Sequence, residues 1–372
     1  MTIPSLPALA LAATLSLILS ACSEAVTPTA GDLQLEEVAA GLAVPWGMAF
    51  VSETEILITE KPGTVQRLDL ETGTLHPVAG APAVVDAGQG GLLDVAVSPN
   101  YDNDRWLYFT YSKVMAKGAA TALGRARLEG DQLVDWQELF VSNLVSDARV
   151  HFGSRIAFDG KGHVFFSHGD RGDRDQAQNL ANHAGTILRL NLDGSIPEDN
   201  PHLGRAGAMP EIWSHGHRNP QGLVYDTATD RLWAIEHGPR GGDELNLVLP
   251  GRNYGWPVVS HGKEYALPKR VGEATSKPGM EDPLKVYVPS IAPGSLLLYR
   301  GDKHPEWRGN LFAGALAMTH LNRIVLDRQG AVVDEVRYLE QRGDRIRSLA
   351  AGPDGTLYLG VDGGRVLRVV SP

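Results

Sequence analysis

Cysteine is almost absent from this 372-residue chain, which contains a single one, Cys22. A fold with one cysteine uses no internal disulfide and no cysteine-based metal cluster. The chain also has no block of Lys and Arg, and its formal net charge is -10 at pH 7. Because phosphate binding requires clustered basic side chains, we expect no nucleic-acid partner.

Three further patterns are missing. No segment has a sustained helical period of apolar residues, which argues against a helical fold. No Gly-x-Ser-x-Gly motif is present, which disfavours serine hydrolases. The chain has 12 histidines but no His-Glu-x-x-His motif and no cysteine pair, so the sequence does not predict a zinc site.

The N-terminal residues differ from the rest. Residues 6–19 are apolar but too short to span a membrane, and Leu-Ser-Ala-Cys at 19–22 follows. This resembles a bacterial lipoprotein signal with lipid on Cys22, although residues 1–7 lack the Lys and Arg that a signal normally has. The alternative is a plain secretory signal with an incidental cysteine. We expect a signal peptide at 1–21, a flexible tether at 22–33 and an exported, periplasmic domain at 34–372, anchored to the membrane only by lipid.

The chain contains instead a repeated pattern of short apolar segments separated by turns with Asp, Pro or Gly. Six copies begin at 46–50, 93–97, 154–158, 222–225, 295–299 and 347–350. Short strands at such a spacing predict an all-β, six-bladed β-propeller with one four-stranded antiparallel sheet per copy. A β-sandwich with extra strands is the alternative and explains the regular pattern less well. Residues 35–44 would close the ring with the last copy.

In a propeller, the loop before each innermost strand opens onto the central axis. One histidine, three arginines and two amides lie at or just before such strands: His151, Arg218, Arg345, Arg347, Gln89 and Asn219. A guanidinium group is suited to carboxylates and phosphates. The expected ligand of the mouth formed by these six residues is therefore a polyanionic small molecule. The alternative is that the arginines pair with Asp and Glu of this acidic chain.

Other candidates come from the loops around this mouth. Gly238 and Pro239 can leave main-chain carbonyls directed at a cation, and calcium accepts such oxygens; Glu244 and Tyr254 offer oxygens for a second calcium. Asp170 lies in a Gly-flanked loop and is either a turn residue or a hydrogen-bond acceptor for a polyol. His151 is the candidate general base, because imidazole titrates near neutrality.

These segments together resemble the soluble quinoprotein sugar dehydrogenases, the group of periplasmic aldose dehydrogenases and soluble glucose dehydrogenases. The resemblance covers nearly the whole chain after the signal and depends on the joint order and spacing of its motifs. They lie at 46–50, 89–93, 151–155, 169–172, 183–190, 216–222, 236–239, 253–257, 289–293 and 344–347.

The resemblance implies a six-bladed propeller that binds pyrroloquinoline quinone (PQQ) and calcium and oxidises aldose sugars at C1 to the lactone. It implies that His151 takes the C1 hydroxyl proton, that Arg218 lies by the reacting quinone oxygens and that Asp170 contacts the substrate. Gly238 and Pro239 would bind the calcium. The remaining cofactor-binding residues would be Gln89, Asn219, Arg345 and Arg347. Electrons would then pass to an external acceptor.

Two positions depart from the family pattern. Ala317 stands where the family often has a lysine that contributes to quinone binding, and Val150 stands where the glucose enzyme has an acidic residue. The large insertions of that enzyme are also missing, which favours the broader aldose type. Two other functions stay open: a calcium-dependent propeller hydrolase such as a sugar lactonase, and a propeller that binds a partner without catalysis.

Overall fold

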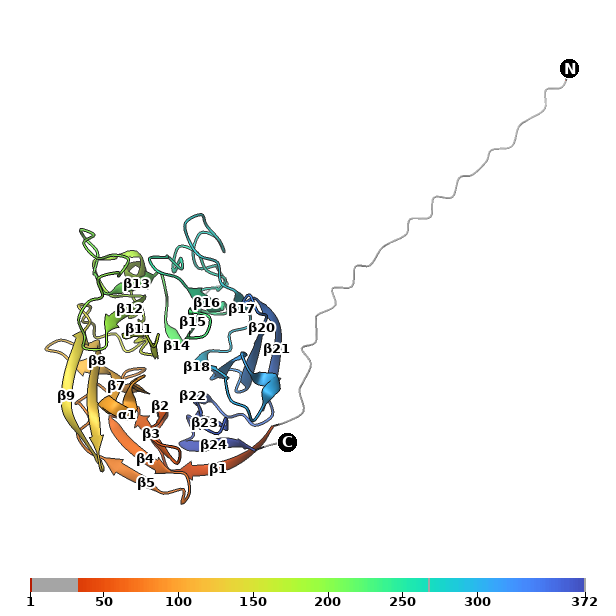
Figure 1. The fold of residues 1–372 in the computed structure, drawn as a ribbon. Coiled ribbons are helices and arrows are strands. Elements are labelled where there is room, and N and C mark those ends of the chain that lie inside the picture. The colour runs from red at the N-terminus through yellow and green to blue at the C-terminus, as the bar shows by residue number, and fades with distance from the viewer. Residues whose placement is uncertain (2–32, 267, 371–372) are drawn as a thin grey trace.

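The computed structural model describes Met1, residues 33–266 and residues 268–370. Within this part of the chain, 24 strands form six four-stranded antiparallel sheets arranged in a ring (Figure 1). The predicted six-bladed β-propeller is therefore confirmed, and the β-sandwich alternative was wrong. The predicted signal peptide after Met1 and the predicted tether up to residue 32, including Cys22, lie outside the described residues.

Five blades consist of strands that follow one another along the chain. Their strands are β2 (Pro45–Phe50), β3 (Glu55–Glu60), β4 (Thr64–Asp69) and β5 (Leu75–Val78); β6 (Leu92–Val97), β7 (Trp106–Val114), β8 (Ala119–Glu129) and β9 (Gln132–Val141); β10 (Ile156–Phe158), β11 (His163–His168), β12 (Thr186–Asn191) and β13 (Ile212–His215); β14 (Pro220–Asp226), β15 (Arg231–Glu236), β16 (Asp243–Val248) and β17 (Lys285–Tyr287); and β18 (Pro293–Leu298), β19 (Leu311–Ala315), β20 (Leu321–Leu326) and β21 (Val332–Tyr338).

The sixth blade joins the two ends of the described chain. It contains β22 (Ile346–Ala351), β23 (Leu357–Val361), β24 (Arg365–Val370) and β1 (Gln34–Ala40). β1 pairs antiparallel with β24, from Gln34 opposite Val370 to Ala40 opposite Arg365. The predicted closing strand is thus confirmed for its first part, and the chain has left the sheet by residue 41.

Helical structure in the described residues is limited to three short elements. They are α1 (Tyr101–Asp104), η1 (Arg174–Gln178) and η2 (Pro305–Trp307). No helix in the described part of the chain is long and apolar enough to cross a membrane.

The blades pack face to face, and this explains why their second strands are nearly continuous apolar runs. In β3, Ile56, Leu57 and Ile58 are all fully buried. Leu57 packs into a cluster with the neighbouring blade β6–β9, whereas Ile56 and Ile58 join a cluster with the blade of β22–β24. A strand covered on both faces needs apolar side chains at consecutive positions rather than at alternate ones.

The first strands of the blades, β2, β6, β10, β14, β18 and β22, contact one another in a closed ring around the axis. Arg155, just before β10, fills the centre of this ring and is 5% exposed. Its guanidinium donates to an acceptor on each of the other five blades: the carbonyls of Gln221 (2.9 Å), Trp46 (3.1 Å), Arg347 (2.9 Å) and Gly294, and the carboxylate of Asp94 (3.0 Å).

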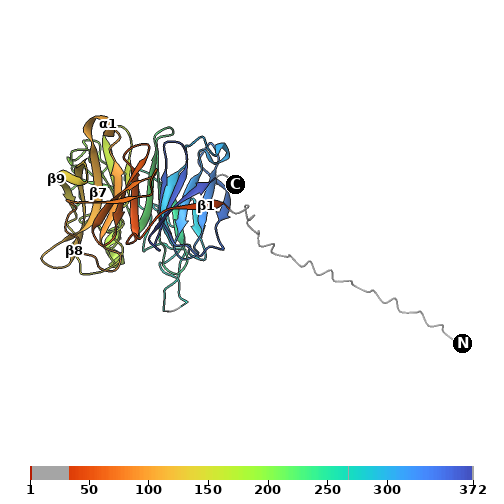
Figure 2. The same cartoon turned by 90° about the horizontal axis from the view of Figure 1, so that it is seen from below.

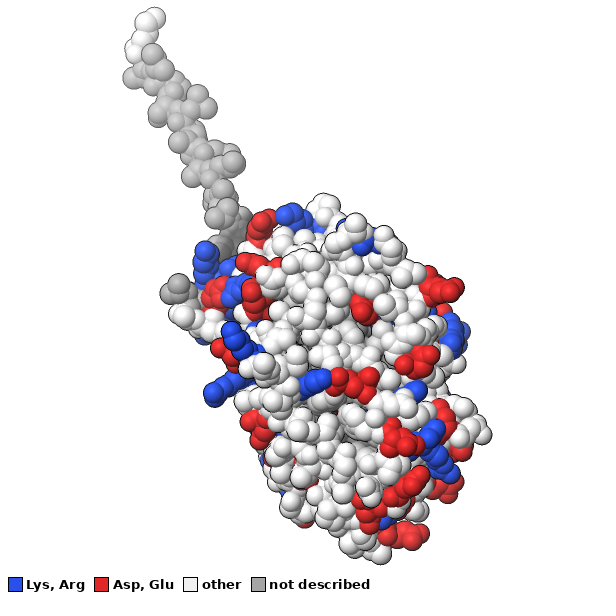
Figure 3. Space-filling model, turned by 90° about the vertical axis from the view of Figure 1, so that its left-hand side faces the viewer, with Lys and Arg blue, Asp and Glu red and all other residues white. Residues whose placement is uncertain are grey.

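The two faces of the ring differ in their loops. Seen from the side, the long connection between β16 and β17 projects from one face, whereas α1 lies at the other (Figure 2). On the surface seen in Figure 3, basic and acidic side chains are interspersed rather than separated into regions of one sign.

Candidate functional site

The structure brings the six axial candidates to the loops that precede the inner strands. Gln89 precedes β6, His151 precedes β10, Arg218 and Asn219 precede β14, and Arg345 and Arg347 flank the start of β22. Gln89 Oε1 accepts from the His151 amide at 2.8 Å, and Asn219 Oδ1 accepts from the amide of Gly153, two residues after His151, at 3.1 Å. Gln89, Arg345 and Arg347 line the same cavity.

A cavity of about 290 Å³ lies among the loops that precede the inner strands. Its lining includes Trp46, Lys61, Gln89, Gln221, His237, Arg345 and Arg347. The volume is near the lower end of the range of small-molecule sites, which is about 300–1,000 Å³. One wall is strongly basic, since three of these side chains carry a permanent positive charge.

The basic wall is partly neutralised by Asp362, at the end of β23. Arg347 binds this carboxylate through two nitrogens, at 2.8 and 2.9 Å, and Arg345 binds it at 2.9 Å. The alternative that the arginines pair with acidic residues is thus correct in part. Lys61 is paired with Asp86, so two carboxylates accompany the three cationic side chains and one positive charge is left over; the Arg345 side chain is 50% exposed. The wall retains positive charge for an anionic ligand.

His151 forms a tight pair with Asp170. Its Nδ1 lies 2.5 Å from Asp170 Oδ1, and its side chain is 13% exposed. Burial lowers the pKa of His151, as does the charge of Arg218, and both outweigh the opposing hydrogen bond to Asp170. His151 is therefore neutral at neutral pH. Since the ionised Asp170 only accepts hydrogen bonds, Nδ1 carries the proton and Nε2 has the free lone pair of a base.

The surroundings of Asp170 do not favour direct contact with a substrate. The residue is 1% exposed. Its Oδ1 accepts from His151 and from the Gly172 amide, and its Oδ2 accepts from Trp256 Nε1 at 2.8 Å. Burial alone would raise the pKa of Asp170, but the hydrogen bond from His151 and the Gly172 amide lower it below the usual value. The geometry makes Asp170 a partner of His151 instead.

Arg218 lies between this pair and a second, smaller cavity. Its Nη1 donates to the His237 carbonyl at 3.2 Å, and its guanidinium carbon is 5.3 Å from the centre of the Trp256 ring. His237 lines both cavities. Its Nε2 contacts the Pro293 carbonyl at 2.7 Å, and burial lowers its pKa to about 3, so it is an uncharged element of the wall.

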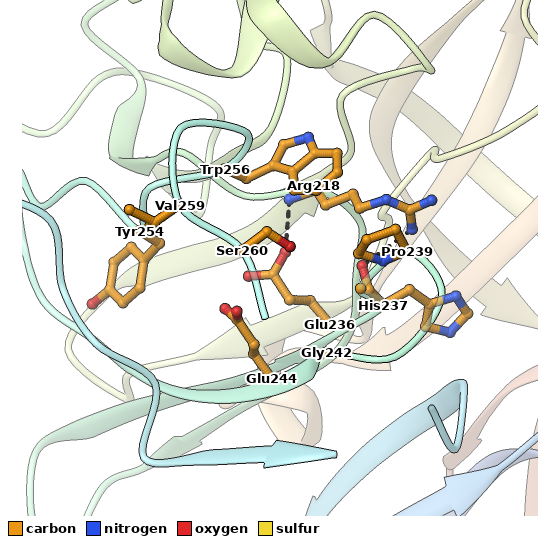
Figure 4. A pocket seen from close by; sticks show the side chains of 11 residues that line it. Arg218, Glu236, His237, Pro239, Gly242, Glu244, Tyr254, Trp256, Val259 and Ser260 are labelled. Atoms are coloured by element: carbon orange, nitrogen blue, oxygen red, sulfur yellow. Dashed lines mark hydrogen bonds between the residues drawn. The ribbon is translucent and has the colours of Figure 1, made fainter. Parts of the chain in front are cut away.

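The smaller cavity, about 10 Å³, has room for one water-sized particle. Two carboxylates meet there: Glu236 of β15 is directly opposite Glu244 of β16, and Figure 4 shows their oxygens directed toward each other. Burial and the charge of Glu236 raise the pKa of Glu244 well above its usual value. Like charges paired across strands are destabilising, so this position favours a cation.

The main chain of Gly238 and Pro239 lines the same cavity. A Cβ on Gly238 would lie 2.1 Å from the Gly242 carbonyl, so the turn tolerates no side chain there. Asp243 holds the turn, because its carboxylate accepts from the Gly238 amide at 2.9 Å and from the Ala292 amide at 2.7 Å.

The Tyr254 hydroxyl does not face this cavity. It donates to the Leu247 carbonyl at 2.6 Å and accepts from the Leu249 amide at 2.8 Å, and Figure 4 shows it directed away from Glu236 and Glu244. The Tyr254 hydroxyl is therefore not placed to bind a metal ion in this cavity, although the Tyr254 main chain lies next to it.

Among the described residues no group of three or more His, Cys, Asp or Glu side chains could hold a metal ion. A calcium site here would need main-chain oxygens as well.

Several residues of the site were missed from the sequence. Lys61 and Asp362 stand in segments whose patterns indicated only strands and turns. Trp256 lies in the motif at 253–257, but the sequence assigned it no role, because its bond to Asp170 depends on long-range packing. His237 could have been found from the sequence, because it lies between Glu236 and Gly238 in a segment already singled out.

The structure also places the two departures from the family pattern. Ala317 is exposed, and Val150 is 37% exposed while its carbonyl accepts from Arg171.

Comparisons with known proteins agree with this geometry. Aldose sugar dehydrogenase YliI from Escherichia coli is 38% identical over 93% of this chain and 95% of its own length. Quinoprotein glucose dehydrogenase B from Acinetobacter calcoaceticus is 27% identical over 87% of this chain and 84% of its own. A PQQ-bound aldose sugar dehydrogenase structure from Streptomyces coelicolor is 28% identical, covers 92% of this chain and 98% of its own, and superposes with a TM-score of 0.75.

A family model described as glucose/sorbosone dehydrogenase matches residues 42–368, which include five complete blades, most of β22–β24 in the sixth and every candidate site residue except Cys22; β1 lies outside the match. The fold and the matched length therefore agree. The chain belongs to the glucose/sorbosone dehydrogenase family.

Proposed function

We propose that this protein is a PQQ-dependent aldose dehydrogenase that oxidises sugars at C1 to the lactone. The observation that carries the proposal is the Asp170-bound His151, whose amide is hydrogen-bonded to Gln89 in the lining of the basic cavity. The named activities of the relatives support the same reaction class.

The residues present fit a polyanionic quinone. Arg345 and Arg347, which share Asp362, and Lys61, which is paired with Asp86, line the cavity and would donate to the carboxylates of PQQ. Asn219 Nδ2 is buried and has no hydrogen-bond partner among the described residues, so it offers an unused donor beside the cavity. Gln89 would contact the cofactor from the other side. When bound, the quinone supplies the two-electron acceptor for the hydride that leaves C1.

His151 performs the proton transfer in this proposal. Its Nε2 takes the C1 hydroxyl proton, and Asp170 holds the tautomer and stabilises the charged imidazole that forms. Arg218, held by the His237 carbonyl, places positive charge where negative charge develops. Asp170 is therefore a positioning residue in this scheme and not the substrate ligand that the family resemblance implied.

Calcium would bind at the smaller cavity, which the main chain of Gly238 and Pro239 lines. The carbonyls of Gly238 and Pro239 would be ligands for the ion that accompanies the quinone. Glu244, with Glu236 and the main chain near Tyr254, would hold a second calcium, since two facing buried carboxylates require a compensating charge.

Export and anchoring are also proposals. The protein would act in the periplasm, attached through lipid on Cys22, and pass electrons to an external acceptor. Replacing Cys22 by Ala should release the protein from the membrane fraction if the lipid is the anchor; an unchanged distribution would contradict this.

The test is a reconstitution of the purified, cofactor-free protein. Dye reduction is followed with glucose and a panel of aldoses, with PQQ, with calcium, with both and with neither. Activity that requires both supports the proposal. Absence of PQQ binding would overturn it, and sugar-lactone hydrolysis without cofactor would favour the hydrolase instead. A protein with neither activity would point to a binding module.

A further inference from the structure

The connection between β16 and β17 carries a small hairpin at residues 262–271, beside the mouth. Lys263 and Arg270 form an antiparallel bridge, and the Glu264 amide donates to the Lys269 carbonyl at 2.8 Å. This connection is the one that projects from the face of the ring in Figure 2. The described residues on its two sides, 262–266 and 268–271, therefore pair with each other.

The base of this hairpin is fixed to the site. Lys263 exchanges two main-chain hydrogen bonds with Arg240, both at 3.1 Å, directly after the proposed calcium turn. Val271 is 2% exposed and packs in one cluster with Trp256. The hairpin is therefore held against the residues that surround the general base.

Tyr265 projects from the hairpin, and its ring is largely exposed. It is 66% exposed, although its hydroxyl lies 3.4 Å from Arg218 Nη2. The preceding residue, Glu264, binds Arg174 through two contacts at 2.7 and 3.3 Å. A single exposed aromatic side chain is common on protein surfaces, so the informative feature of Tyr265 is its contact with Arg218 and not its exposure.

Tyr265 and His151 belong to one chain of contacts. His151 binds Asp170, Asp170 accepts from Trp256 Nε1, and the Arg218 guanidinium lies over the Trp256 ring at 5.3 Å. Arg218 then meets the Tyr265 hydroxyl. The open face of the tyrosine is thus placed at the same mouth as the general base.

We propose that Tyr265 is the surface on which the sugar ring of the substrate stacks, and that it sets the affinity for aldoses; this rests on the proposed dehydrogenase function. A pyranose has an apolar C–H face and a polar edge. A tyrosine ring can cover the apolar face while its hydroxyl stays hydrogen-bonded, here to Arg218. Such a contact orients the sugar without any change in the chemistry at C1.

The competing role is that Tyr265 only positions Arg218 through its hydroxyl. The two roles predict that different Tyr265 variants lose activity. Stacking needs the ring, so Tyr265→Phe and Tyr265→Trp should retain function and Tyr265→Ala should not. Positioning needs the hydroxyl, so Phe, Trp and Ala should be equally harmful and should lower kcat.

The experiment measures kcat and KM for several aldoses in the PQQ- and calcium-loaded enzyme, and PQQ affinity separately by fluorescence titration. Tyr265→Ala should raise KM about tenfold, the loss of one aromatic contact, with kcat and PQQ affinity nearly unchanged. Val333→Ala is the matched control, because Val333 is 60% exposed on β21 and belongs to no part of the site.

Three results would overturn the inference: an unchanged KM in Tyr265→Ala, a parallel loss of PQQ affinity, or a kcat defect shared by Tyr265→Phe. Failure of the proposed function is recognised separately, because the wild-type protein would then oxidise no aldose while it still folds. Wild-type turnover with an unaffected Tyr265→Ala variant would remove this inference alone.

Discussion

At the scale of single residues, the site depends on how His151 is held. Its Nδ1 is paired with Asp170, and Asp170 is in turn held by Trp256 and the Gly172 amide. A base held in this way has a fixed tautomer and a fixed direction for its free nitrogen. The backbone contributes as well, because His151 has a positive φ of 53°, and a non-glycine residue in that region needs surrounding contacts to hold it.

The pH dependence of the wild-type enzyme follows from His151. Burial lowers its pKa below 6.5, so the neutral, active form persists into mildly acidic solution and is lost only as pH falls through the lowered value. We expect kcat/KM to be constant above pH 6.5 with an acidic limb whose midpoint lies below it. A midpoint above pH 6.5 would contradict this assignment of the base.

Replacing Asp170 by Asn distinguishes its two candidate roles. As a positioning residue it raises the pKa of His151 and fixes its tautomer. The variant should therefore lose about 10²-fold or more in kcat and move the acidic limb to lower pH. If Asp170 bound the substrate instead, KM would rise and the acidic limb would stay in place.

At the scale of elements, the hairpin of β15 and β16 brings two acidic residues face to face. Glu236 and Glu244 are directly paired across the ladder. Glu236 has partners, since its Oε1 contacts His217 at 2.8 Å and its Oε2 accepts from the Arg218 amide at 2.6 Å. Glu244 has the raised pKa, caused by burial and by Glu236. We therefore expect cation binding at this pair to change the stability of the protein.

Calcium should therefore stabilise the protein through this hairpin. A carboxyl whose pKa is raised in the folded state stabilises the fold at low pH and loses that contribution as pH rises through the raised value. We expect calcium to raise Tm more at pH 8 than at pH 5. Glu244→Gln should reduce that increase, whereas Glu273→Gln, which changes an exposed residue, should not. An equal calcium effect in both variants would exclude Glu244 as a ligand.

The sequence predicted the elements better than the contacts of the site. Short apolar runs at regular spacing indicated six blades, and even the closing strand β1 was anticipated, because period and turn chemistry are local properties. The axial candidates followed from their position before each first strand. The roles of Asp362, Lys61 and Trp256 were not predicted, because their partners are distant in the sequence. The engagement of the Tyr254 hydroxyl with residues 247 and 249 was not predicted either, because it is visible only in the structure.

At the scale of the whole molecule, Arg155 joins the blades at the axis. Its five acceptors come from five different blades, and Asp94 is the charged one. Three of the acceptors, the carbonyls of Trp46, Gln221 and Arg347, belong to residues that line the 290 Å³ cavity. The same guanidinium therefore stabilises the ring and fixes the floor of the site.

Arg155→Met should be strongly destabilising. It leaves the Asp94 carboxylate buried without its partner, and removing one member of a buried pair costs about 3–5 kcal/mol. Arg252→Met is the control, because the Arg252 side chain is 59% exposed and its loss should change stability by about 0.5 kcal/mol or less. Denaturant unfolding of the two variants gives the comparison. Equal stability of both would show that the axial contacts contribute little.

The most direct test of the account is a single-turnover experiment without dye. Wild-type protein and His151→Gln are loaded with PQQ and calcium, one equivalent of aldose is added, and the absorbance of the bound quinone is followed. The account predicts rapid reduction in the wild type and reduction about 10²–10⁴ times slower in His151→Gln, with equal PQQ affinity. Equal rates of reduction, or no reduction by any aldose in the wild type, would contradict it.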